Sequence, residues 1–231
     1  MKEKLKVIGF DADDTLWVNE DYYRQTEKHY AELLSEYGET STIMDELFQT
    51  EMKNLDLYGY GIKPFVISMV ENAIRVSEGK VSTAIISKIM DMGKEMMEKP
   101  IELLPGVREV IEALHGKYRL IVVTKGDLLD QERKLKKSSL SSYFHHIEIM
   151  SDKTINSYKE LLHHLEIQAE EFVMIGNSLR SDIHPPYELG CHVIHVPYEL
   201  TWQHEMDVKE LSENERFHKV ENLKEILGII H

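Results

Sequence analysis

The feature that most constrains this chain is a series of short apolar runs, rich in β-branched residues, that alternate with stretches of helical periodicity. Runs that are apolar at nearly every position predict strands buried on both faces. Strands of this kind separated by helices predict an α/β fold, in which a parallel sheet has helices on both faces. The five runs are Leu5–Phe10, Arg119–Val123, His145–Ile149, Phe172–Ile175 and His192–Val196.

One long insertion interrupts this alternation. Between the first and second predicted strands, about 80 residues show only helical periodicity, which is enough chain for a small separate domain. Candidate helices there are Tyr22–Tyr37, Pro64–Ser77 and a segment around Ile89. We therefore expect a core domain formed by residues 1–18 and 100–231, and a helical domain formed by residues 19–99.

The charge of the chain narrows its possible partners. Its 231 residues include 41 acidic and 27 basic side chains, which give a formal net charge of −14. Such a protein repels polyanions, so we expect no nucleic-acid partner and no membrane partner. It also repels anionic substrates, so a phosphate site would need a local cation. The sequence makes no prediction about oligomeric state.

The cysteine content and the N-terminal segment predict a cellular location. Cys191 is the single cysteine and can form no internal disulfide, so nothing in the chain requires an oxidising compartment. Met1–Lys4 leads directly into the first apolar run without the apolar segment of a secretory signal. No apolar run approaches the length that spans a membrane. We therefore expect a cytoplasmic protein.

Three carboxylates directly follow the first predicted strand, in the segment Asp11-Ala12-Asp13-Asp14-Thr15. Ligands bind at the carboxyl ends of strands in open α/β sheets. Like charges so close together raise the free energy unless a cation or a proton neutralises them, which predicts a divalent metal. Asp11 could attack phosphorus as a nucleophile while Asp13 acts as general acid and base. A solvated turn or a helix N-cap is the alternative, and the preceding strand favours the site.

A strand followed by Asp11-x-Asp13-x-Thr15 resembles the first motif of the phosphatases in the haloacid dehalogenase-like (HAD) superfamily. The resemblance implies a Rossmann-like core in which the inserted helices form a cap domain. The second motif of the family is a Thr or Ser at the end of the next core strand, and Thr124 stands there. Its hydroxyl would hold the phosphoryl oxygens.

The third motif of the family is a lysine upstream of the fourth strand. Lys153 fits it better than Lys159, because Lys159 lies within a predicted helix, where a lysine is usually an exposed surface residue. The resemblance implies that the Lys153 ammonium offsets the charge of the nucleophile and binds phosphate. Thr124 and Lys153 are therefore expected to be both catalytic and substrate-binding residues.

The fourth motif of the family is an acidic loop after the next strand, and Gly176-Asn177-Ser178 followed by Asp182 resembles it. The chain departs from the family at Asn177, where Asp is the common residue, so Asp182 becomes the main acidic ligand of this loop. The resemblance implies a Mg²⁺ site formed by Asp11, the main-chain carbonyl of Asp13 and Asp182. We expect Asn177 to bind substrate.

Three further residues have two possible interpretations each. Lys63 follows Tyr58-Gly59-Tyr60-Gly61, a break between predicted helices of the insertion, and could contact an anionic group of the substrate or be a surface residue of a turn. Lys125 could add positive charge beside Thr124 or be solvated. Trp202 could flank the site or pack the C-terminal segment against the core.

The expected function is the Mg²⁺-dependent hydrolysis of a small phosphorylated metabolite through a phosphorylated Asp11. Asp13 and Thr15 together favour phosphoryl transfer over the attack on carbon that the dehalogenases of this family perform. A phosphomutase would use the same residues, and it is an alternative together with a 2-haloacid dehalogenase. In a different class, a non-catalytic relative could bind a phosphorylated ligand, and Asn177 is the one feature that favours this.

Overall fold

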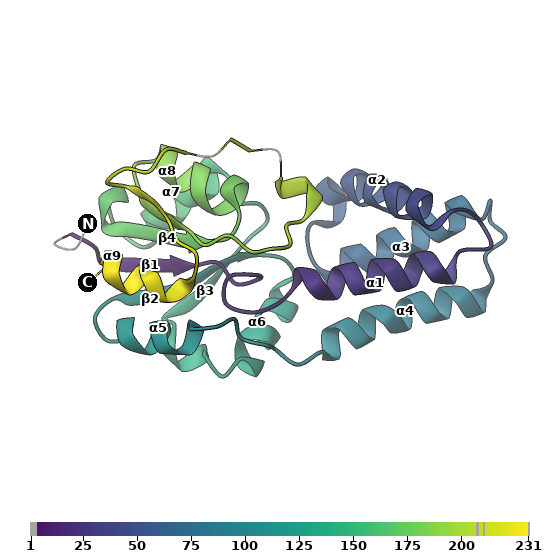
Figure 1. Ribbon diagram of the computed structural model, residues 1–231, viewed down its shortest axis with the longest axis horizontal. Helices are drawn as coiled ribbons and strands as arrows, with labels where there is room; N and C mark the ends of the chain where they lie inside the picture. Colours follow the sequence, from purple (N-terminus) through teal and green to yellow (C-terminus); the bar gives the residue numbers. More distant parts are fainter. Residues whose placement is uncertain (1–3, 207, 210, 231) are drawn as a thin grey trace. The chain divides into compact units, whose positions relative to one another are not determined.

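The chain contains a six-stranded parallel sheet, described here from a computed structural model that covers residues 4–206, 208–209 and 211–230. The strand order is β3-β2-β1-β4-β5-β6, so β1 lies in the middle of the sheet between β2 and β4 (Figure 1). This confirms the predicted α/β fold with a parallel sheet. The strands are β1 (Val7–Phe10), β2 (Arg119–Lys125), β3 (His146–Met150), β4 (Phe172–Gly176), β5 (His192–His195) and β6 (Phe217–Lys219).

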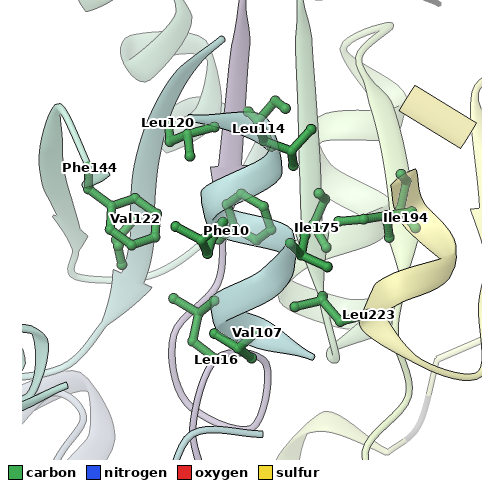
Figure 2. Close-up of a cluster of buried hydrophobic side chains, with 14 of the residues drawn as sticks. Phe10, Leu16, Val107, Leu114, Leu120, Val122, Phe144, Ile175, Ile194 and Leu223 are labelled. Atoms are coloured by element: carbon green, nitrogen blue, oxygen red, sulfur yellow. The ribbon is translucent and has the colours of Figure 1, made fainter. Parts of the chain in front are cut away.

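Both faces of the sheet are buried, as nearly continuous apolar strands require. Successive side chains of a strand point to opposite faces, and those of β1 alternate between two hydrophobic clusters: Ile8 and Phe10 belong to one, and Val7 belongs to the other. Figure 2 shows the first cluster, in which Phe10 lies between Val122 and Ile175, and the helix α5 (Val107–Leu114) adds Val107 and Leu114. Packing on both faces fixes the end of β1 in the sheet.

Helices cover the two faces of the sheet (Figure 1). On the face of the first cluster lie α5 and α9 (Ile226–Ile230), and on the other face lie α7 (Ile155–His164) and α8 (His184–Glu188). The helix α6 (Leu128–Lys137) follows β2. Short 3₁₀ turns occur at Ser141–Tyr143, Ala169–Glu171, Gln203–Glu205 and Leu223–Glu225, and Leu179–Ile183 forms a π-helical turn.

The chain divides into two compact units. The first contains the sheet and consists of Met1–Glu20, Ile101–Lys125 and Gln131–His231, and the second consists of Asp21–Pro100 and Gly126–Asp130. Gly126–Asp130, which the sequence analysis assigned to the core domain, belongs to the second unit by its contacts. The chain therefore returns to the second unit directly after β2, the strand that carries Thr124.

Four helices form the second unit: α1 (Glu20–Leu33), α2 (Thr40–Tyr58), α3 (Ile62–Val76) and α4 (Thr83–Glu98). They surround a third hydrophobic cluster, to which Tyr30, Leu47 and Met69 contribute. The hydroxyl of Tyr30 donates to the carbonyl of Met69 at 2.9 Å, so this buried polar group is satisfied. In the described part of the chain, no helix combines the length and apolar character needed to cross a membrane.

Candidate active site

Asp11 lies at the carboxyl end of β1, the central strand. Its amide nitrogen donates to the carbonyl of Ile175 at 2.8 Å and so continues the pairing of β1 with β4. The carboxylate is buried, and each oxygen has a donor: Nζ of Lys153 lies 2.5 Å from Oδ1, and Oγ1 of Thr15 lies 3.1 Å from Oδ2. Donors on both oxygens hold the carboxylate in one orientation.

Lys153 connects the carboxylates of Asp11 and Asp182. It lies in the turn before α7, its side chain is 1% exposed, and its Nζ also donates to Oδ1 of Asp182 at 2.6 Å. Burial opposes the charged ammonium, but the two carboxylates outweigh burial and raise the pKa of Lys153. Lys159, the alternative considered from the sequence, is an exposed residue of α7.

Asp182 reaches this cluster because the loop after β4 folds back closely on the end of the strand. A Cβ atom at Gly176 would lie 2.3 Å from Oδ2 of Asp182, so this position leaves room for the carboxylate only when it is glycine. The π-helical turn Leu179–Ile183 carries Asp182, and the amide nitrogen of Ser178 donates to its Oδ2 at 3.0 Å. Asp182 is 1% exposed.

The buried cluster carries an excess of negative charge, because two carboxylates share one ammonium. Burial and the neighbouring Asp182 raise the pKa of Asp11 to about 7, although Lys153 acts in the opposite direction. A cation at the oxygens of Asp11 and Asp182 would remove the excess charge.

The donor chemistry of Asp11 and Asp182 fits Mg²⁺. This ion takes oxygen ligands only, and it is commonly held by one or two carboxylates together with water and substrate phosphate. Among the described residues, no three His, Cys, Asp or Glu side chains are grouped in a way that could hold a metal ion. The fit therefore depends on two carboxylates and on the predicted third ligand, the main-chain carbonyl of Asp13.

The carboxylate of Asp13 has a separate set of partners, all of them hydrogen-bond donors. Nε1 of Trp17 donates to Oδ1 at 2.7 Å, and Nε2 of Gln131 donates to Oδ2 at 2.8 Å. Nζ of Lys134 lies 3.0 Å from Oδ1 and 3.2 Å from Oδ2. Burial opposes the charge, but Lys134 and Gln131 outweigh burial and lower the pKa of Asp13.

Gln131 and Lys134 were not singled out from the sequence. They are three residues apart on α6 and therefore share one face of this helix. That spacing is the signal that could have identified them as a pair. It contains no information about which side chain of the core the pair would contact.

Thr124 and Asn177 lie at the ends of the two strands that flank β1. Thr124 is 1% exposed, and its hydroxyl donates to the carbonyl of Lys125 at 3.1 Å. The main-chain nitrogen of Asn177 donates to Oγ1 of Thr15 at 3.1 Å, and the same Oγ1 lies 3.2 Å from Oδ1 of Asn177. Thr15 thus contacts both Asp11 and the loop after β4.

The third carboxylate of the first motif, Asp14, has a structural set of contacts. Its oxygens accept from the main-chain nitrogens of Asn19 at 2.8 Å and Glu20 at 3.0 Å, where α1 begins. Asp14 therefore caps the start of α1. A helix N-cap was the alternative interpretation given above for the aspartates of this segment.

Lys63 belongs to the second unit and forms an ion pair there. Its Nζ lies 2.8 Å from Oδ1 of Asp127, which is also part of that unit. Asp127 additionally accepts from the main-chain nitrogen of Asp130 at 3.1 Å, near the start of α6. The pair joins the start of α3 to the segment that follows β2.

The structure thus combines a parallel α/β sheet with Asp11, Lys153 and Asp182 grouped beyond the carboxyl end of the central strand β1. Residues 5–184 match the family described as haloacid dehalogenase-like hydrolase. The chain belongs to this family, and it is an enzyme.

The chain is similar to several proteins of known sequence or structure. It is 21% identical over 218 residues to the glyceraldehyde 3-phosphate phosphatase of Pyrococcus furiosus, covering 91% of this chain and 88% of that protein. The solved structure of a haloacid dehalogenase-like family hydrolase from Xanthomonas campestris is 36% identical, covers 96% of this chain and 88% of its own, and has a TM-score of 0.84. A 2-haloacid dehalogenase from Pseudomonas syringae shares the fold at 17% identity, 98% coverage of both chains and a TM-score of 0.66.

Proposed function

We propose that this enzyme is a Mg²⁺-dependent phosphatase that hydrolyses small phosphorylated metabolites through a phosphorylated Asp11. The observation that carries the proposal is the buried Asp11 carboxylate, held by Lys153 at 2.5 Å beside the second carboxylate Asp182. A nucleophile in a fixed orientation, next to a cation that can bind the transferred group, suits phosphoryl transfer.

In the first proposed step, a carboxylate oxygen of Asp11 attacks the phosphorus atom and the bond from phosphorus to the ester oxygen breaks. Asp13 gives its proton to the leaving oxygen, and the products are an alcohol and an acyl phosphate on Asp11. Lys153 and the hydroxyl of Thr124 bind the phosphoryl oxygens, and Asn177 contacts the substrate from the loop after β4.

In the second step, Asp13 takes a proton from water, whose oxygen attacks the phosphorus atom. The bond between phosphorus and Asp11 breaks, which releases phosphate and restores the carboxylate. Mg²⁺ held by Asp11, the carbonyl of Asp13 and Asp182 would neutralise charge on the phosphoryl group. The neutral Asn177 leaves Asp182 as the acidic ligand from its loop.

The presence of Asp13 supports phosphoryl transfer over the dehalogenase alternative, while a phosphomutase would use the same residues. A dehalogenase attacks carbon and does not need this second aspartate, whereas hydrolysis of a phosphate ester needs an acid for the leaving group. A phosphomutase would keep water away while the substrate reorients. A non-catalytic relative would have less reason to retain both Asp11 and Asp13.

The helical domain, residues 19–99, is proposed to act as a cap that selects the leaving group, and Lys63, which is paired with Asp127, is proposed to contact an anionic part of the substrate. The named activity of the Pyrococcus furiosus relative makes triose phosphates the first compounds to test. We propose a cytoplasmic location, since the lone Cys191 forms no internal disulfide.

The proposal is tested by measuring phosphate release from an aryl phosphate and from triose, sugar and acyl phosphates, with Mg²⁺ and with a chelator. We expect Mg²⁺-dependent release by the native enzyme and background release by Asp11→Asn. Asp13→Asn should lose on the order of 10²–10⁴-fold in turnover, as expected for a removed general acid and base. Asp45→Asn, which alters an exposed aspartate of α2, is the matched control and should retain native turnover.

The other outcomes have distinct signatures. Halide release from 2-haloacids without phosphate release would identify a dehalogenase. Isomerisation of a sugar phosphate without free phosphate would identify a mutase. Binding of phosphorylated compounds without any turnover would identify a non-catalytic relative. Equal phosphate release by native enzyme and Asp11→Asn would reject Asp11 as the nucleophile.

A further inference from the structure

Glu205 is a buried carboxylate in a part of the chain that has little regular structure. It ends the 3₁₀ turn Gln203–Glu205, between β5 and β6, yet only 9% of its side chain is exposed. Burying a carboxylate is costly unless its oxygens are fully hydrogen-bonded. The contacts of Glu205 meet this condition.

Three side chains donate to the two oxygens of Glu205, and the single hydrogen of the Ser181 hydroxyl is shared between them. Nζ of Lys125 lies 2.6 Å from Oε1, and Oγ of Ser181 lies 3.0 Å from Oε1 and 2.9 Å from Oε2. The hydroxyl of Ser178 donates to Oε2. Nζ of Lys125 also donates to Oγ of Ser181 at 3.0 Å, so the four side chains form one connected network.

These partners lie at the ends of two strands, β2 and β4, that are not neighbours in the sheet. Lys125 is the last residue of β2, whereas Ser178 and Ser181 belong to the loop after β4, and β1 lies between the two strands. Strands separated by one neighbour are about 10 Å apart. The network therefore links the chain on either side of the strand that ends at Asp11.

We propose that Glu205 is a positioning residue that ties the end of β2 to the loop after β4 and so fixes Thr124 relative to Asp182. Thr124 directly precedes Lys125, and Ser178 contacts Asp182 through its main-chain nitrogen at 3.0 Å. This role rests on the proposed phosphatase function, in which Thr124 holds the phosphoryl group while Asp182 belongs to the metal site.

The ion pair with Glu205 also fixes the position of the Lys125 ammonium and balances its charge. An ammonium 2.6 Å from a buried carboxylate has its charge balanced within the protein. Without Glu205, the Lys125 ammonium would lose the carboxylate that balances its charge and could compete with Lys153 for the substrate phosphate. Loss of Glu205 should therefore reduce kcat more than it raises KM, because alignment matters most in the transition state.

The test compares Glu205→Ala, Glu205→Gln, Lys125→Met and the double variant Glu205→Ala/Lys125→Met, with Glu199→Gln as control. Glu199 is an exposed carboxylate of the same segment. We expect Glu205→Ala to lower kcat by about 10- to 100-fold, the size of effect that a misplacement of about 1 Å produces. Glu205→Gln keeps one acceptor oxygen, which can accept from the Ser178 and Ser181 hydroxyls in the place of Oε2, and should recover part of the loss.

The double variant separates positioning from general destabilisation. If Glu205 acts through Lys125, the loss in the double variant should match the larger single loss rather than the product of the two. A purely structural anchor would lower the melting temperature while leaving kcat native at temperatures well below it, and that result would overturn the proposal. Glu199→Gln should match the native enzyme in both measurements.

Hydrogen exchange gives a readout that does not depend on phosphatase activity. We expect faster amide exchange in Leu179–Ile183 and at the end of β2 in Glu205→Ala than in the native protein. If the native enzyme releases no phosphate but the exchange changes as expected, the proposed function fails while the link between the two strand ends stands. Native exchange in Glu205→Ala would overturn the link itself.

Discussion

The carboxylate of Asp13 is held by α6 in a way that favours its charged form. Nε2 of Gln131 donates both to Oδ2 of Asp13 and to the carbonyl of Lys125, at 2.8 Å and 2.9 Å. A main-chain carbonyl can only accept, so the Gln131 amide cannot turn round without losing both bonds. Lys134 adds a positive charge at 3.0 Å. Asp13 is therefore held in the charged form that acts as the base of the second proposed step. In the first proposed step Asp13 must carry a proton, and the same donors oppose its protonation.

Removal of the Lys134 ammonium tests this positioning. We expect Lys134→Met to lower kcat by about tenfold, which corresponds to the roughly 1.5 kcal/mol of one hydrogen bond to a charged group. Trp17 and Gln131 would still hold Asp13, so the loss should be smaller than that of Asp13→Asn. Steady-state kinetics of both variants measures the difference.

The control for this variant is Lys136→Met, which removes an exposed lysine of the same helix. It should leave kcat and KM native. An equal loss in both lysine variants would indicate an effect of charge in general and would contradict a specific role of Lys134.

At the residue scale, the sequence located the cluster but not its supporting contacts. Asp11, Lys153 and Asp182 each follow or precede a strand in a recognisable motif, and strand ends of a parallel sheet meet at one edge. Gln131, Lys134 and Glu205 lie in segments without such a motif. Their partners are more than 20 residues away in the chain, and those contacts depend on how helices and loops pack.

At the scale of helices and strands, the elements missed from the sequence are those with weak apolar patterns. The buried face of α2 contains Ile43 and Leu47 but continues with the polar residues Thr50 and Asn54. The amide of Asn54 is satisfied within the unit by Ser68 at 3.1 Å. A buried face of this composition does not give an apolar stripe. The strand β6 is only Phe217–Lys219, too short to show an alternation.

Gly93 determines how closely α3 and α4 pack. A Cβ atom there would lie 2.2 Å from Cγ2 of Val66, so the two helices meet at this glycine. A Gly to Ala change inside a helix normally stabilises by about 1 kcal/mol. Overpacking costs about 1–3 kcal/mol, and a β-branched valine in a helix has one strongly preferred rotamer. We expect Gly93→Ala to lower the free energy of unfolding of the second unit by about 1 kcal/mol.

Denaturant unfolding of two further variants identifies the cause. Adding Val66→Ala to Gly93→Ala removes the clashing methyl groups, so the double variant should lose less free energy of unfolding than the sum of the two single losses. Ser87→Ala, at an exposed position of α4, should be neutral or slightly stabilising. A stabilising Gly93→Ala would show that Val66 moves aside at little cost.

At the scale of the whole molecule, the hydrophobic clusters follow the division of the chain. The two clusters around the sheet draw their residues from the first unit, and the third cluster draws its residues from the second. Separate cores allow two parts of a chain to unfold separately. The sequence-based division into residues 1–18 with 100–231 and residues 19–99 remains a prediction, which unfolding experiments can test.

Magnesium should act on one of the two units only. Asp11 and Asp182 both belong to the first unit, so binding there stabilises that unit by about 2.7 kcal/mol at 100 times the dissociation constant. In calorimetry we expect two unfolding transitions. Mg²⁺ should raise the midpoint temperature of one, and Gly93→Ala should lower the midpoint temperature of the other. Asp182→Asn should abolish the Mg²⁺ effect without moving the Gly93-sensitive transition. A single transition that responds to both changes would show that the two cores unfold as one cooperative unit, because stabilising either part would then stabilise the whole chain.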